Sequence, residues 1–394
     1  MIHEYRLHAL DAVRASALLL GIVLHATMSF FLPIPAMDVS QSSTLAVLFY
    51  VIHMFRMSLF FLIAGFFAHM VFHRRGARAF MHDRFKRITL PMLIGWVIVS
   101  PLLGVIVIWG LIRTFGADAG AGTEAPDMGL PLTHLWFLYY LCLFYVGFLT
   151  LRFLLVDVLD KSGVLKRAAD KLVSLLLSSV FGPLVLGLPL ALVLYNSPLW
   201  HGWFGLPTPD YGLMPQLPAI AGYGLAFMLG WLLHRQSELL STISSRGVFY
   251  LAVALILTGL CLSLVGLVPS MELPFADAAS WQKPVYVLSY TMAIWFWVLG
   301  IIGTAIRFLS APSVVWRYLA DASYWMYLAH LPLVFFLQVV VAQWPLHWVI
   351  KFPMILLVAT SLLLLSYHTL VRPTRLGRWL NGKSVPRQTW ASQP

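Results

Sequence analysis

Long apolar segments recur along the whole chain, and they limit the possible folds more than any other feature. A helix needs about 20 mainly apolar residues to cross a bilayer, and in lipid its backbone must hydrogen-bond internally. Ten segments meet or approach that length: 10–32, 45–72, 90–112, 133–155, 180–196, 214–234, 248–267, 285–306, 316–342 and 348–371. The sequence therefore predicts an all-α integral membrane protein, a bundle of about ten transmembrane helices within one domain, 1–371.

The composition agrees with this class of protein. Of the 394 residues, 60% are hydrophobic and 10% are charged, whereas a soluble globular chain has about 25% charged residues. The segments between the apolar stretches are short, so any chemistry belongs to the helix bundle. Cys142 and Cys261 both lie in apolar stretches, which argues against a disulfide framework or a cysteine metal site.

Basic residues predict the orientation of the chain. If both termini are cytoplasmic, most of the 26 lysines and arginines lie in cytoplasmic segments, notably 74–87, 152–171 and the tail 372–394. This distribution follows the positive-inside rule. We therefore interpret the net charge of +11 as a topology signal, with the lipid bilayer as a partner and no nucleic acid. Residues 372–394 are predicted to be a basic cytoplasmic tail.

The first apolar segment carries Asp11, Arg14 and His25. An ionisable residue inside a membrane is expensive, so each is a functional-site hypothesis. Arg14 and His25 are separated by close to three helical turns, so they share one face at roughly 16 Å along the axis. Asp11 and Arg14 are three residues apart, and an ion pair at the interface explains them equally well.

Two other segments carry polar residues at helical spacing. His53 and Arg56 adjoin on one face, and Ser323, Tyr327 and His330 form one stripe. Depth counting places the histidines at comparable heights, which suggests a polar chamber. The alternative is structural, because a single intramembrane histidine more often joins two helices and a tyrosine more often packs.

Two further features have simpler explanations. His134 with Trp136 fits an aromatic belt at the membrane interface. No carboxylate lies beside His25, His53 or His330, so we expect no metal site.

Five motifs, in order, resemble the membrane acyltransferase-3 family. They are the spacing of Arg14 and His25, FFLIAGFF at 60–67, RFKRITLP at 84–91, HLWFL at 134–138 and SYWMYLAH at 323–330. One departure is Ala64, where the family usually has serine. The resemblance implies a multi-pass acyltransferase of the bacterial cytoplasmic (inner) membrane.

The resemblance also implies the substrates. Family members move an acyl group from cytoplasmic acyl-CoA to a hydroxyl, commonly of a sugar on the far side of the membrane. LDAVRASALLLGIVLH and HMFRMSLFF look most like the members that succinylate periplasmic glucans. We therefore expect succinyl-CoA or acetyl-CoA as donor, a periplasmic glucan or other carbohydrate as acceptor, and no bound cofactor.

Roles for individual residues follow from this chemistry. His25 is the candidate base that takes the hydroxyl proton, and His330 orients or polarises the thioester. Arg56 is placed to pair with the free carboxylate of a succinyl group. His53, Ser323 and Tyr327 are further candidates for substrate binding. Arg14, Arg84 and Arg87 are candidates for the CoA phosphates, although the positive-inside rule also explains them.

A second function class stays open from the sequence. A secondary transporter or flippase uses intramembrane histidine and arginine residues for proton relay or anion binding. Two observations disfavour it: the halves of the chain show no repeat, and the spans contain few carboxylates.

Overall fold

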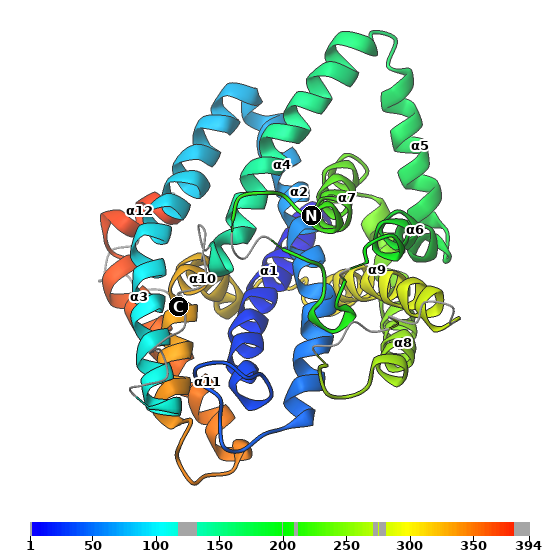
Figure 1. Ribbon diagram of the computed structural model, residues 1–394. Helices are drawn as coiled ribbons and strands as arrows, with labels where there is room; N and C mark the ends of the chain where they lie inside the picture. Colours follow the sequence, from blue (N-terminus) through cyan, green and yellow to red (C-terminus); the bar gives the residue numbers. More distant parts are fainter. Residues whose placement is uncertain are drawn as a thin grey trace.

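The computed structural model describes residues 2–116, 132–198, 200–208, 212–270, 275 and 281–381. All regular elements in these residues are helical, which confirms the all-α fold (Figure 1). The α-helices are α1 (Ile2–Thr27), α2 (Ser43–Arg84), α3 (Leu90–Phe115), α4 (Trp136–Arg152), α5 (Val164–Ser178), α6 (Gly182–Tyr195), α7 (Leu217–Arg235), α8 (Leu239–Val265), α9 (Gln282–Phe308), α10 (Val314–Val341), α11 (Trp348–Ser366) and α12 (Arg375–Asn381). Residues 382–394 of the expected tail lie outside the described residues.

The chain has the helices of a multi-pass membrane protein. Within the described residues, eight helical stretches are long and apolar enough to cross a membrane, or nine if the pair α5 and α6, bent by 114°, is one span. This number is lower than the ten segments expected, because two of those segments are joined in one continuous helical stretch. One stretch, Ser43–Phe115, runs for 73 residues and contains both expected segments 45–72 and 90–112. Gly76, at φ 76°, interrupts this stretch.

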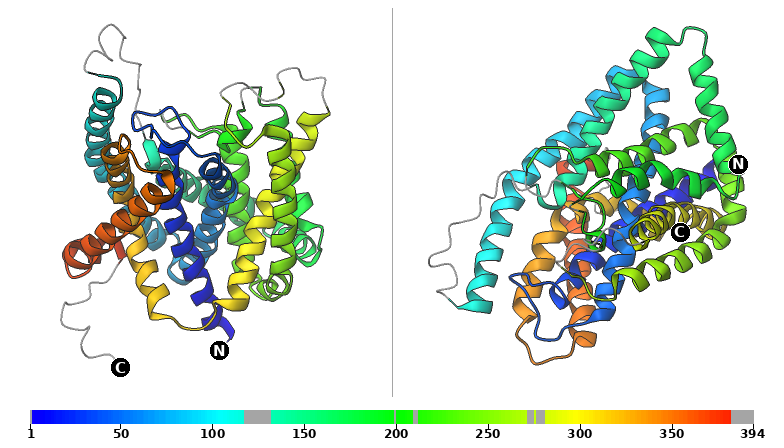
Figure 2. Two further views of the ribbon diagram at one scale, coloured as in Figure 1. Left: turned by 90° about the horizontal axis from the view of Figure 1, so that it is seen from below. Right: turned by 45° about the vertical axis from the view of Figure 1, so that its right-hand side comes forward.

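The helix α1 runs through the middle of the bundle (Figure 2). It packs against α2, α9, α10 and α11, while α2 packs closely on α7 and α8 on α9. At the far end of α1, the α1–α2 loop is anchored by a buried ion pair between Lys351 Nζ and Asp38 Oδ1, 2.8 Å apart. Lys351 also donates to the carbonyl of Ala342 at 3.1 Å. These contacts join the end of α1 to α10 and α11.

The helix α5 differs from its neighbours because it is amphipathic. Lys166, Arg167 and Lys171 alternate with leucines at 165, 172 and 175–177. A helix with one basic and one apolar face is typical of a membrane surface rather than of a span. The sharp bend between α5 and α6 is consistent with a surface helix that turns into the bundle.

Candidate active site

Three imidazoles from three separate segments meet inside the bundle. His25 lies in the last turn of α1, His330 in α10, and His134 in the short 3-10 helix η4 (Thr133–Leu135) before α4. The ring centroids of His25 and His330 are 5.2 Å apart, and those of His134 and His330 are 5.1 Å apart. We call these three residues the imidazole cluster. The structure therefore brings together the two histidines that the sequence singled out for catalysis.

Hydrogen bonds orient the cluster. Tyr327 donates its hydroxyl hydrogen to the carbonyl of His134 at 2.5 Å, and His330 Nδ1 lies 2.7 Å from the carbonyl of Tyr327. Because a carbonyl only accepts, we assign the hydrogen of neutral His330 to Nδ1, which leaves a lone pair on Nε2. His330 is thus arranged to accept a proton or a hydrogen bond at Nε2.

A third contact holds His25 through its backbone. Gln338 Nε2 of α10 donates to the carbonyls of His25 at 2.9 Å and Ala26 at 3.2 Å. These carbonyls lie at the end of α1, where helix carbonyls have no partner in the next turn. The glutamine therefore fixes the end of α1 against α10.

Arg56 and His53 of α2 lie beside the cluster. Both residues, with His134 and His330, are electrostatic neighbours of the His25 ring. The Arg56 guanidinium packs against Gly21 of α1. The His53 ring lies against Phe49, with ring centroids 5.0 Å apart, and against Gly205 of the α6–α7 connection. His53 and Arg56 therefore lie near the His25 ring.

Several buried nitrogens at this place have no hydrogen-bond partner among the described residues. They are His25 Nδ1, His53 Nδ1, Arg56 Nε, His134 Nε2 and His330 Nε2. An unsatisfied buried polar group costs about 1–3 kcal/mol, and native proteins keep few of them. Their concentration in one place indicates a site that satisfies them with a polar ligand.

The other predicted site residues lie apart from the cluster. Arg14 Nη2 pairs with Asp11 Oδ1 at 3.1 Å, so the ion pair anticipated from the sequence is present. Arg84 and Arg87 both pair with Asp83, at 3.2 and 3.1 Å. Arg14 lies about three helical turns before His25 in α1. Arg84 ends α2, beyond Gly76, and Arg87 follows in the π-helix η2 (Phe85–Thr89).

Ser323 and Tyr327 differ in their positions. Ser323 is buried and donates to the Ala320 carbonyl of its own helix at 2.8 Å, so its hydroxyl hydrogen is already used. Tyr327 supports both His134 and His330, and its ring centroid lies 5.4 Å from that of His134. The structure thus connects Tyr327, and not Ser323, to the imidazole cluster.

Sequence reasoning missed His134. The aromatic-belt interpretation placed it at the interface, but the residue is only 7% exposed and its ring packs against Tyr327 and His330. The signal was present, because HLWFL at 134–138 is one of the five motifs that carry the family resemblance.

Comparison with known proteins identifies the family. The profile of the acyltransferase domain, type 3, matches residues 7–366. The chain belongs to this acyltransferase family. It is similar to glucans biosynthesis protein C of Escherichia coli K12, with 27% identity over 345 residues that cover 84% of this chain and 83% of the relative. The protein of that name from Escherichia coli O1:K1 / APEC is 26% identical over the same length. No solved structure matches.

Proposed function

We propose that this acyltransferase moves a succinyl group from cytoplasmic acyl-CoA to hydroxyls of a periplasmic glucan or another extracytoplasmic sugar. The family supports the reaction class. The name of the relatives links those proteins to glucan biosynthesis, and the resemblance of the His53 and Arg56 segment supports the succinyl donor. The family also disfavours the transporter alternative.

The proposed topology has ten crossings of the bacterial inner membrane and two cytoplasmic termini. It counts Ser43–Phe115 as two spans and α6 as one, with α5 at the membrane surface. In Figure 2 (left) the α1–α2 and α10–α11 loops lie at one end of the bundle, and the start of α1 and the α9–α10 link lie at the other. This alternation supports the topology. The donor then enters from the side where α1 begins.

The proposed chemistry uses the unpartnered imidazole nitrogens. The acceptor hydroxyl oxygen attacks the thioester carbonyl carbon while His25 takes the hydroxyl proton. The tetrahedral intermediate expels the thiolate of CoA as the carbon–sulfur bond breaks, and the thiolate receives the proton back from His25. His330 orients His25, and its Nε2 lone pair stabilises the imidazolium that forms. His134 keeps His330 in place through Tyr327.

The single observation that carries the succinyl assignment is Arg56. Its guanidinium lies beside His25, and none of the ion pairs among the described residues involves it. A buried cation needs a counter-charge. The free carboxylate of a succinyl group supplies this charge when the thioester reaches His25, and an acetyl group does not.

The test is acyl transfer in proteoliposomes with labelled succinyl-CoA and acetyl-CoA on the side where α1 begins and glucans on the other. Wild type should release CoA and label the glucan, and His25→Ala should not. His82→Ala is the matched control, because this exposed histidine of α2 lies outside the cluster. If wild type turns over neither thioester, the proposal fails. If folded His25→Ala retains full activity, the role of His25 fails.

A further inference from the structure

A second candidate site lies between α2, α4 with its π-helical extension η5 (Phe153–Leu159), α5 and α7. It is a cavity of about 280 Å³. Its basic lining residues are Arg152, Lys166 and Arg235, together with His69 and His73. Helical periodicity places His69 and His73 on the face of α2 opposite His53 and Arg56. The cavity is therefore separate from the imidazole cluster.

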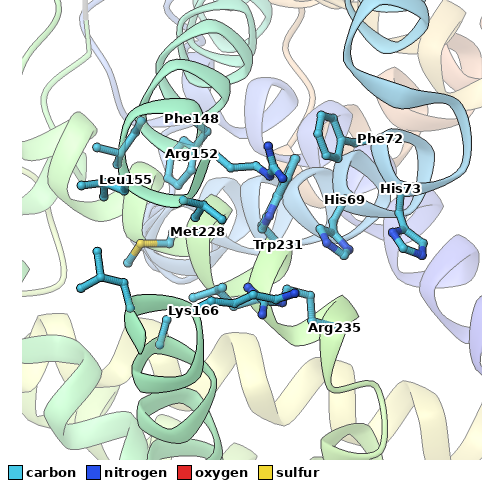
Figure 3. A pocket seen from close by; sticks show the side chains of 15 residues that line it. His69, Phe72, His73, Phe148, Arg152, Leu155, Lys166, Met228, Trp231 and Arg235 are labelled. Atoms are coloured by element: carbon cyan, nitrogen blue, oxygen red, sulfur yellow. The ribbon is translucent and has the colours of Figure 1, made fainter. Parts of the chain in front are cut away.

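The cations approach the cavity from different helices. In Figure 3 the Arg152 side chain enters from one side and Arg235 from the other, with Trp231 between them. Arg152 Nη1 pairs with Asp157 at 2.7 Å and Arg235 Nη2 pairs with Asp170 at 2.6 Å. A guanidinium has five N–H donors, so each arginine keeps donors for a ligand.

Lys166 adds a charge that is not neutralised. None of the ion pairs formed within the described part of the chain involves Lys166. Its helix, α5, carries further basic residues, Arg167 and Lys171. The cavity therefore favours an anion.

Most of the cavity wall is apolar. Leu151, Leu155, Leu165 and Met228 line it beside the cations, and Leu151, Leu155 and Leu165 are exposed large hydrophobic residues. A soluble anion gains nothing from such a wall, whereas an acyl chain does. Basic pockets between membrane helices recognise acidic lipid headgroups, and amphipathic basic helices such as α5 lie in the headgroup layer.

We propose that this cavity binds one anionic phospholipid, with its phosphate among Arg152, Lys166 and Arg235 and an acyl chain against the leucines. The site fastens the surface helix α5 to α4 and α7. This proposal is independent of the acyl-transfer reaction, because it involves none of the residues placed in that reaction.

The test is native mass spectrometry of the full chain in detergent with dioleoyl phosphatidylglycerol or dioleoyl phosphatidylcholine. Wild type should retain one phosphatidylglycerol in preference to phosphatidylcholine. Each basic residue near a membrane surface contributes about fivefold in affinity. Lys166→Gln should therefore weaken phosphatidylglycerol binding about fivefold, and Arg152→Gln with Lys166→Gln about 25-fold. Arg307→Gln, an exposed arginine at the end of α9, is the matched control and should change nothing.

Two results would overturn the proposal. Equal retention of both lipids by wild type shows that the cations do not select a headgroup. An equal loss in Arg307→Gln shows that only the overall charge matters. A second experiment adds inorganic phosphate to the wild-type protein with bound phosphatidylglycerol. It measures the thermal unfolding midpoint and the amount of lipid that is displaced. If phosphate at millimolar concentration stabilises the protein and displaces the lipid, the site takes a soluble anion, and the lipid assignment is wrong.

Discussion

Gly21 of α1 lies directly against the guanidinium of Arg56 from α2, because a Cβ atom at position 21 would overlap Arg56 Nη1. This contact places a cation one helical turn from His25. Every residue other than glycine has a Cβ atom, so any substitution at position 21 would push against the Arg56 guanidinium.

We predict that Gly21→Ala displaces Arg56 and lowers succinyl transfer. A shift of about 1 Å in a positioning group costs on the order of 100-fold at most, and acetyl transfer should fall less because it does not use the charge. The measurement is kcat/KM with each donor. Gly259→Ala in α8 is the matched control, because a Cβ there meets nothing within 4 Å. Equal losses with both donors contradict the prediction.

Arg56→Gln tests the charge itself. A hydrogen bond to a charged group is worth about 1.5–3 kcal/mol, so kcat/KM for succinyl-CoA should fall by about 10- to 100-fold. Acetyl-CoA should remain a substrate at close to the wild-type rate. If kcat/KM falls equally with succinyl-CoA and acetyl-CoA, Arg56 does not bind the succinyl carboxylate.

His134→Phe separates a chemical role from a packing role. Phenylalanine keeps an aromatic ring against His330 but has no nitrogen to replace the unpartnered Nε2. We expect kcat to fall by about 100-fold while the protein stays folded, because the bound ligand loses a hydrogen-bonding nitrogen. An unchanged kcat means that His134 only supports its neighbours.

Gln338→Met should loosen the end of α1. The variant leaves the carbonyls of His25 and Ala26 without the donor Nε2, at a cost of about 1–3 kcal/mol in the free energy of unfolding. Both the thermal midpoint in detergent and kcat should decrease, since His25 lies in the same turn. Gln338→Leu, which has a similar volume and also lacks the NH₂ group, should behave like Gln338→Met. A wild-type midpoint in both variants contradicts this role.

Lys351→Met should be strongly destabilising because it leaves the Asp38 carboxylate buried without its partner. Removal of one member of a buried ion pair costs about 3–5 kcal/mol. Adding Asp38→Leu to Lys351→Met should restore much of this loss. Lys283→Met is the control, because the ammonium of this partly exposed lysine lies over the Tyr195 ring and its loss should cost less than about 1 kcal/mol. The measurement is the thermal midpoint in detergent.

The helices could be predicted with more success than the spans or the site. Apolar length predicted α3, α4, α7 and α9–α11 close to their observed bounds, because each segment must satisfy its own backbone in lipid. The helices α1 and α8 were also expected, but they begin at Ile2 and Leu239, well before the expected starts at residues 10 and 248. It did not show that the segments 45–72 and 90–112 belong to one helical stretch. The basic segment 152–171 was expected as a cytoplasmic segment, with no helix assigned beyond residue 155, but it contains the first half of α5 (Val164–Ser178).

The site was predicted in part. His25, His53, Arg56 and His330 were chosen because ionisable groups are rare inside membranes, and the structure brings them together. Arg14, Arg84 and Arg87 were chosen for charge, and the structure pairs them with Asp11 and Asp83. Their roles stay predictions.

The sequence by itself determined that this chain is an all-helical membrane protein, that its motifs follow the order of an acyltransferase family, and which residues share a face of one helix. Only the tertiary structure decided that the His134 ring packs against His330, that the Arg56 guanidinium packs against Gly21, and that Gln338 donates hydrogen bonds to the end of α1. The physical reason is that helical periodicity is a local property. The choice of neighbouring helices depends on close packing and interhelical hydrogen bonds between segments far apart in the chain.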